Sequence, residues 1–158
     1  MKVKIKFKPL SELAFIPKKA IEGAAAYDVY VPKNTIIQRG RQIVPLDFAI
    51  EIPYGYEAKI EPRSGFSSKG MEGFSVLSTF DGESRARFNC DVLQGKIDSD
   101  YRGCVGVIVN NQECEFSILR GTRIAQLTIY KVEDAEFELS EELSETKRGD
   151  GGYGSTNR

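Results

Sequence analysis

Two aspartates, a serine and a tyrosine stand together in a short segment between glycines, residues 95–103. It reads Gly95-Lys96-Ile97-Asp98-Ser99-Asp100-Tyr101-Arg102-Gly103 and leads into the apolar run 105–109. A glycine-bounded polar turn before β-branched residues predicts a hairpin entering a strand, and loops on such scaffolds often carry chemistry. A carboxylate in this turn can serve as a general base. The other interpretation is that Asp98, Ser99 and Asp100 only form the turn, by bonding their own backbone.

The sequence limits the chemistry further because it contains no histidine. Catalytic systems that pair serine or cysteine with histidine are excluded, and so are imidazole metal ligands. Any base is therefore a carboxylate, or else a lysine, a tyrosine or a thiolate.

A second polar position lies within the apolar segment 124–130. Alternation places three apolar side chains on one face of a predicted strand and Gln126 with Thr128 on the other. Gln126 is then available to a ligand, although a solvated strand glutamine fits the same pattern.

The C-terminal segment 140–158 differs in composition from the rest of the chain. It is rich in Glu, Ser, Lys, Arg and Gly, and four glycines fall within residues 149–154. We expect a mobile tail that either stays disordered or becomes ordered on a ligand or a neighbouring subunit. Its backbone amides are suited to wrap a phosphate, but no lysine follows the glycines as in a Walker A loop.

The elements that must position these groups are short strands. Apolar segments recur between Gly, Pro, Asn and Asp, and only residues 64–69 resemble a helical turn. This spacing predicts an all-β sandwich or barrel. The predicted strands are residues 2–8, 25–31, 35–37, 42–52, 56–60, 104–109, 116–119, 124–132 and 135–139.

Length and charge favour one domain with small-molecule or protein partners. The 158 residues carry 22 basic and 23 acidic side chains, so the net charge is near zero. This charge does not indicate nucleic acid or an anionic membrane as a partner. Three cysteines without a CxxC spacing argue against a disulfide framework and a zinc site. Because no signal-like or membrane-spanning run is present, we expect a protein of the reducing cytoplasm.

Five blocks, taken in order, resemble the five motifs of the trimeric dUTPase family. They are residues 25–29 (Ala-Ala-Tyr-Asp-Val), 62–65 (Pro-Arg-Ser-Gly), 95–103, 121–127 and 148–156. The resemblance implies a jelly-roll-like β-barrel that assembles as a homotrimer, with a mobile glycine-rich C-terminal tail that closes the active site. It also implies hydrolysis of dUTP to dUMP and pyrophosphate, which keeps uracil out of DNA and supplies dUMP for dTMP synthesis.

The resemblance assigns the reaction to the turn at 95–103. It implies that Asp98 is the general base that activates water for attack on the α-phosphorus. Tyr101 resembles the residue whose ring packs under the deoxyribose and excludes a 2′-hydroxyl. Main-chain groups around Val92, Gly95 and Ile97 are expected to read uracil, although some members use an asparagine side chain where Val92 stands.

The other motifs are expected to bind the phosphates and Mg²⁺. Arg63 and Arg148 are cations that can converge on a triphosphate, and Ser64 and Gly65 form a turn whose serine contacts the phosphate chain in the family. Gln126 is a further ligand contact. In the tail, the resemblance implies an aromatic ring on the uracil and donors around the γ-phosphate, here Tyr153, Gly154, Ser155 and Thr156.

The first motif is expected to serve the metal. Asp28 resembles the carboxylate that contacts a Mg²⁺ site through water, the ion being held mainly by substrate phosphates.

The expected domain boundaries are a β-barrel over residues 1–139 and a tail over 140–158. Residues 66–94 form a longer connection than the family usually has, so we expect an inserted hairpin at about 70–92 around the Asp81-Gly82 turn signal. Such a hairpin is a surface ornament, a trimer contact or a protein-docking arm.

Two other functions stay open at this point. One is a dCTP deaminase of the same superfamily, which would need its own catalytic glutamate and a different C-terminal ending. The other is a non-enzymatic regulatory or docking protein that acts through the insertion. Asp98, Ser64, Gln126 and Arg148 together speak against an inactive site.

Overall fold

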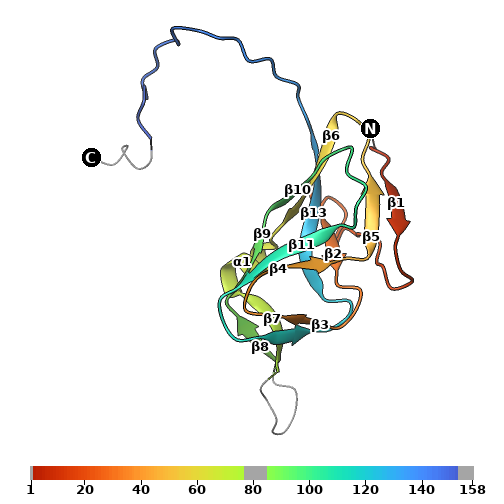
Figure 1. Cartoon of the computed structure of the whole chain (residues 1–158). Coiled ribbons are helices and arrows are strands. Elements are labelled where there is room, and N and C mark those ends of the chain that lie inside the picture. Colours follow the sequence, from red (N-terminus) through yellow and green to blue (C-terminus); the bar gives the residue numbers. More distant parts are fainter. Residues whose placement is uncertain (1, 77–84, 153–158) are drawn as a thin grey trace.

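The computed structural model describes residues 2–76 and 85–152, and nearly all of its regular structure is β (Figure 1). A body of strands carries one short helix, and the C-terminal segment extends away from that body (Figure 1). The predicted all-β class is confirmed. The strands are β1 (Lys6–Pro9), β2 (Tyr27–Tyr30), β3 (Thr35–Ile37), β4 (Gly40–Pro45), β5 (Phe48–Glu51), β6 (Tyr56–Glu61), β7 (Met71–Ser75), β8 (Arg85–Phe88), β9 (Cys90–Leu93), β10 (Gly95–Ile97), β11 (Gly106–Asn111), β12 (Phe116–Ile118) and β13 (Arg123–Lys131), and the helix is α1 (Ser64–Lys69).

Antiparallel pairing arranges the described strands in four small sheets. The sheet that bears on function has the order β10-β6-β13-β2. The other orders are β4-β11-β9, β3-β12-β7-β8 and the pair β1-β5. The turn that follows β10 and the strand β2 therefore lie at opposite edges of one sheet, with β6 and β13 between them.

Strand alternation builds the core between these sheets. Val107 and Val109 of β11 are fully buried, and Ala58 and Ile60 of β6 are at most 1% exposed. The rings of Phe88 and Phe116 stack with their centroids 4.1 Å apart, which joins β8 to β12. The apolar faces thus fix the positions of the strands that carry the polar groups.

The hairpin expected at about 70–92 contains two strands of the body. β7 and β8 pair with Met71 opposite Phe88, and both side chains are buried in the core. Gly73 lies so close to the Phe116 ring that a Cβ atom would overlap it. The base of the hairpin is therefore part of the packed structure rather than an ornament. The Asp81-Gly82 turn signal lies outside the described residues.

Several predicted strands were wrong in extent. Residues 42–52 form two strands, because Asp47 takes a left-handed conformation (φ 56°) between them and accepts a hydrogen bond from the Ser11 hydroxyl at 3.0 Å. In the hairpin expected at about 70–92, the second strand is interrupted at Asn89: β8 before it pairs with β7, whereas β9 after it pairs with β11. The N-terminal strand begins at Lys6 rather than Lys2.

The strand predicted at 135–139 is absent. This segment lies beyond the body and its side chains are exposed, with Phe137 at 97% and Leu139 at 99% (Figure 1). A strand needs a neighbouring strand to satisfy its backbone, and the described chain offers none here. Within the described ranges α1 is the only helix, and it is too short to cross a membrane.

Candidate active site

A cavity of about 730 Å³ opens beside β2, and we call it the basic pocket. Six basic and two acidic residues line it, and both acidic residues are ion-paired. An excess of positive charge in a cavity raises the local electrostatic potential, which attracts anions. The basic residues are Lys18, Lys19, Arg63, Arg85, Arg120 and Arg123.

Asp28 joins two arginines from different elements at this pocket. It is 9% exposed, and its Oδ1 lies 3.2 Å from Nε of Arg63 while its Oδ2 lies 3.3 Å from Nη1 of Arg123. Arg63 also donates to the carbonyl of Arg123 at 3.5 Å, and its guanidinium lies 5.4 Å from the ring centroid of Phe66. The Asp28 cluster, defined as these three charged residues, thus holds two guanidiniums whose remaining N–H donors suit phosphate oxygens.

Gln126 lies next to this cluster. On β13 it is directly opposite Asp28 of β2 and also opposite Glu61 of β6, and it is half-buried. Directly paired residues share a face of the sheet, so Gln126 points to the same side as Asp28. Thr128 of that face donates to Glu61 at 2.8 Å, which agrees with the polar face predicted for this strand.

Ser64 and Gly65 form the first turn of α1, directly after Arg63. Both are exposed, and Arg63 itself is the residue before the helix, with extended backbone angles of φ −78° and ψ 140°. Ser64 therefore directly follows an arginine that lines the basic pocket.

The turn after β10 fixes the ring of Tyr101. The Tyr101 hydroxyl donates to the carbonyl of Cys104 at 3.1 Å, and the ring lies against Gly103, where any Cβ atom would overlap it. Asp98 begins the same turn, is exposed, and accepts a hydrogen bond on its carbonyl from the amide of Tyr101 at 3.2 Å. The turn therefore presents a carboxylate and an aromatic ring that is 45% exposed.

Arg102 stabilises this turn from within. It donates from Nη1 to the carbonyl oxygens of Ser99 and Tyr101, at 2.6 and 2.9 Å. Lys96, two residues before Asp98, forms an ion pair with Glu57 that raises the pKa of the lysine. These contacts stabilise the turn and the strand that leads into it.

The residues expected around uracil offer main chain rather than side chains. Val92 and Ile97 are each 6% exposed, and Gly95 has no side chain. Among the described strands β9 pairs only with β11 and β10 only with β6, so each has one edge whose backbone groups have no strand partner. Such an edge can form hydrogen bonds to a planar base.

The structure does not bring Asp98 to the basic pocket. Asp98 follows Ile97, which pairs with Ala58 near the start of β6, whereas Arg63 comes after the end of β6. A strand rises about 3.3 Å per residue, so the Ala58 and Arg63 positions are about 17 Å apart. One chain thus holds the two halves of the predicted site at opposite ends of β6.

The described part of the tail extends away from the body of strands (Figure 1). Arg148 is exposed, and its Nε donates to the carbonyl of Gly151 at 2.7 Å within the tail itself. The remaining predicted tail contacts, which are Tyr153, Gly154, Ser155 and Thr156, lie outside the described residues.

Arg123, Arg120 and Lys18 line the basic pocket but were not among the predicted site residues. Arg123 starts the strand that carries Gln126, so its position becomes recognisable once β2 and β13 are known to be neighbours. Lys18 accepts a backbone hydrogen bond from the amide of Asp28 at 2.7 Å, a contact that no periodicity indicates. Arg120 follows β12, in the turn before β13.

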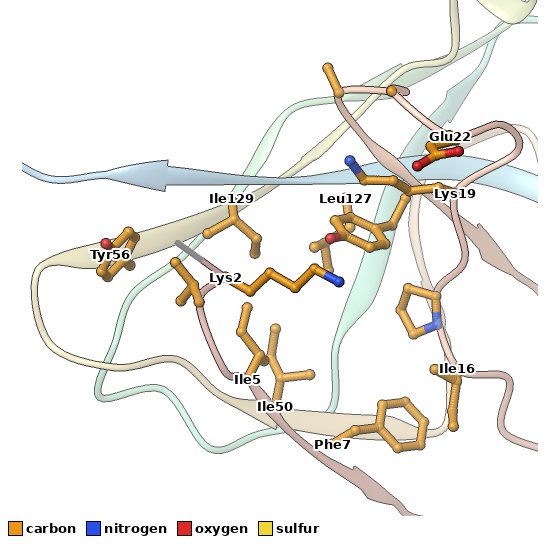
Figure 2. A pocket seen from close by; sticks show the side chains of 15 residues that line it. Lys2, Ile5, Phe7, Ile16, Lys19, Glu22, Ile50, Tyr56, Leu127 and Ile129 are labelled. Carbon is orange, nitrogen blue, oxygen red and sulfur yellow. The ribbon is translucent and has the colours of Figure 1, made fainter.

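A slightly larger cavity, of about 760 Å³, is lined by none of the three residues of the Asp28 cluster. Its walls are mostly apolar: Ile5, Ile50 and Ile129 face it, and the Lys2 side chain runs across it (Figure 2). A binding site is indicated by a few convergent polar groups in a cavity rather than by its size. The basic pocket is therefore the better candidate.

Comparison with known proteins identifies the family of this chain. The family model described as dUTPase matches residues 13–83 and 82–157. The deoxyuridine 5'-triphosphate nucleotidohydrolase of Nautilia profundicola is 40% identical over 158 residues, which cover 99% of this chain and 100% of that protein. The two matched segments meet within the expected insertion.

Solved structures share the fold. The dUTPase of Staphylococcus bacteriophage 80alpha with dUPNHPP has a TM-score of 0.80 at 24% identity, covering 98% of this chain and 99% of that one. A mutant dUTPase of phage phi11 of S. aureus, described for its coordination of a structural Mg(II) ion, has a TM-score of 0.71 at 22% identity, covering 88% of this chain and 97% of that one. Since the family model and the bacterial relative match nearly the whole sequence, this chain belongs to the dUTPase family.

Proposed function

We propose that this protein hydrolyses dUTP to dUMP and pyrophosphate. The observation that carries the proposal is the Asp28 cluster at the basic pocket of a member of the dUTPase family. Two arginines on one carboxylate are pre-positioned donors for phosphate oxygens. Phosphate transfer needs little more from a protein than such positioning and charge stabilisation.

Asp98 acts as the general base. Its exposed carboxylate accepts a proton from water while that water attacks the α-phosphorus, the bond to the bridging oxygen breaks and pyrophosphate leaves. Tyr101 supports the deoxyribose with the exposed face of its ring. Because Gly103 and the hydrogen bond to Cys104 hold that ring in place, it can exclude a 2′-hydroxyl by contact.

Substrate contacts follow from the placement of the other residues. Arg63, Arg123 and Gln126 contact the phosphates together with the turn formed by Ser64 and Gly65. The main chain at Val92, Gly95 and Ile97 reads uracil, which is supported by the burial of the Val92 and Ile97 side chains.

Mg²⁺ fits this site with Asp28 in a water-mediated role. Both oxygens of Asp28 already carry a guanidinium contact, and no group of three His, Cys, Asp or Glu side chains suited to a metal occurs among residues 2–76 and 85–152. This ion keeps much of its water and binds phosphate oxygens, so the substrate would hold it and Asp28 would contact its water. When bound, it neutralises phosphate charge.

The active site is completed by neighbouring copies in a homotrimer of jelly-roll-like β-barrels. Two observations support this. Asp98 and Arg63 lie at opposite ends of β6, and the extended C-terminal segment carries apolar side chains, such as Phe137 and Leu139, that are almost fully exposed in one chain. Exposed apolar surface of this kind favours burial against a partner.

The tail, residues 140–158, closes the site of a neighbouring copy. Its role would be to place Tyr153 on uracil and to surround the γ-phosphate with Arg148, Gly154, Ser155 and Thr156. The extension of the described part of the tail away from its own body supports an intersubunit reach (Figure 1).

One assay tests the function directly. Pyrophosphate release is measured with Mg²⁺ from dUTP, dCTP, dTTP and UTP at equal concentrations. We expect dUTP to be hydrolysed far faster than the other three. Comparable rates for all four nucleotides, or release of ammonia from dCTP, would contradict the proposal, and the latter would indicate a deaminase.

A further inference from the structure

The basic pocket carries two arginines that the Asp28 cluster does not use. Arg85 of β8 and Arg120 of the turn after β12 both line the cavity. Within residues 2–76 and 85–152, neither forms an ion pair with a carboxylate. Their positive charges therefore remain uncompensated by the described part of the protein.

Aromatic rings hold these two guanidiniums instead. The Arg85 guanidinium lies 5.8 Å from the ring centroid of Phe74, and that of Arg120 lies 4.7 Å from the ring centroid of Phe15. A guanidinium stacked on a ring keeps its charge and the N–H donors at its edge. Both arginines are thus oriented without losing their capacity to bind an anion.

A neighbouring arginine on the same strand shows the contrast. Arg87, two residues after Arg85, pairs with Glu72 at 3.8 Å and donates to the carbonyl of Gly70 at 3.3 Å. Arg87 is not among the residues that line the basic pocket. Among the described residues, Arg87, which lies outside the pocket, has a carboxylate partner, whereas Arg85, which lines the pocket, has none.

We propose that Arg85 and Arg120 bind the terminal phosphate of the nucleoside triphosphate, so that the start of β8 and the turn after β12 are part of the substrate site. The terminal phosphate carries the largest charge of the three and gains most from unpaired cations. The proposal rests on the proposed function, which it extends by giving Arg85 and Arg120 a role in sensing the number of phosphates.

The test compares ligands that differ in phosphate number. Dissociation constants are measured by calorimetry for dUMP and for a non-hydrolysable α,β-imido analogue of dUTP with Mg²⁺. The variants are Arg85→Gln and Arg120→Gln, and Arg87→Gln is the matched control on the same strand. Melting temperatures verify folding, and Arg85→Lys keeps the charge if the glutamine variant is unstable.

We expect Arg85→Gln and Arg120→Gln each to weaken the triphosphate analogue about tenfold, as loss of a charge-assisted hydrogen bond does. Binding of dUMP should stay within about twofold, and Arg87→Gln should leave both ligands within about twofold, because exposed ion pairs contribute little. Arg85→Lys should retain most of the preference for the triphosphate.

Two results would overturn this inference. In the first, Arg85→Gln and Arg120→Gln bind the triphosphate analogue as tightly as Arg87→Gln does. In the second, these two variants lose affinity for dUMP and for the analogue by the same factor. The parent protein is assayed for dUTP hydrolysis alongside. An active parent with unaffected variants refutes only the role of Arg85 and Arg120, whereas an inactive parent refutes the proposed function.

Discussion

Glu57 and Lys96 form an ion pair of 2.7 Å that ties the second residue of β6 to the middle residue of β10, two positions before Asp98. Glu57 is 8% exposed and also lies 3.3 Å from Nζ of Lys59. β10 has three residues and pairs with β6 alone in the described sheets, so this side-chain contact adds to few backbone hydrogen bonds. The pair anchors the edge strand that presents Asp98.

The first prediction concerns the pH dependence of that anchor. Lys96 donates a hydrogen bond to the Glu57 carboxylate, and this bond holds the pKa of Glu57 below its ordinary value of 4.5 and raises the pKa of Lys96 above its ordinary value of 10.5. Because the pKa of Glu57 is lowered, the ion pair stabilises the fold above pH 4.5, and this stabilisation is lost as the pH falls. Because the pKa of Lys96 is raised, the pair stabilises the fold below pH 10.5, and this stabilisation is lost as the pH rises.

Glu57→Gln should therefore lower the melting temperature at neutral pH, and the gap to the parent protein should close toward about pH 3. Thermal unfolding followed by circular dichroism across this range measures the gap. A gap that stays constant between about pH 3 and pH 7 would show that the pair does not contribute in the way described.

The second prediction concerns the base. Asp98→Asn removes the proton acceptor and preserves size, so turnover should fall by about 10² to 10⁴ while binding of the imido analogue stays nearly the same. Asp100→Asn, two residues later in the same turn, is the control and should retain activity. Turnover of the Asp98 variant within about tenfold of the parent would remove Asp98 from this role.

The third prediction concerns sugar selection. Tyr101→Ala removes the ring that lies against Gly103, so the kcat/KM for UTP relative to dUTP should rise by about tenfold or more. Tyr101→Phe keeps the ring and loses only the hydrogen bond to Cys104, and should stay close to the parent ratio. An unchanged ratio in Tyr101→Ala would mean that another group excludes the 2′-hydroxyl.

The fourth prediction tests the shared site by mixing two inactive proteins. One is Asp98→Asn with an intact tail, and the other keeps Asp98 but lacks residues 148–158. In cyclic trimers formed at random from equal amounts, about three-quarters contain both types, and each of these has one complete site out of three. Activity should recover to about a quarter of the parent value.

Each protein alone serves as the negative control, and subunit exchange is verified by mass spectrometry of differently tagged chains. The tail deletion alone should leave the melting temperature nearly unchanged, because residues 140–150 are exposed. Absence of recovered activity in demonstrably mixed trimers would place Asp98 and the tail of one site on the same chain.

The fifth prediction concerns thiol reactivity. Burial raises the pKa of Cys90 to about 12, with the neighbouring Asp91 carboxylate adding to the effect, and the side chain is 2% exposed. Alkylation needs the thiolate, so Cys90 should resist iodoacetamide near pH 8 until the protein unfolds. Mass spectrometry of native and urea-unfolded samples measures this, and equal labelling of Cys90 in both would contradict its burial.

Local sequence patterns predicted the all-β class correctly and narrowed the range of possible catalytic bases. Alternation is a local pattern, so it correctly placed Gln126 on the polar face of β13 and Leu127 on the opposite, buried face. The absence of histidine is a property of composition, and it restricted the base mainly to carboxylates. The ordered blocks identified the family because each is a short contiguous segment.

Tertiary structure alone decided which of these residues meet. Asp28 and Arg123 are 95 positions apart in sequence and become ion-paired only because β2 and β13 are neighbouring strands, whose register shifts between Arg123 and Ala125. Register depends on packing across the whole sheet, which no local period encodes. For the same reason the structure separated Asp98 from Arg63 along β6, and it left residues 135–139 unpaired because a strand forms only where a second strand accepts its hydrogen bonds.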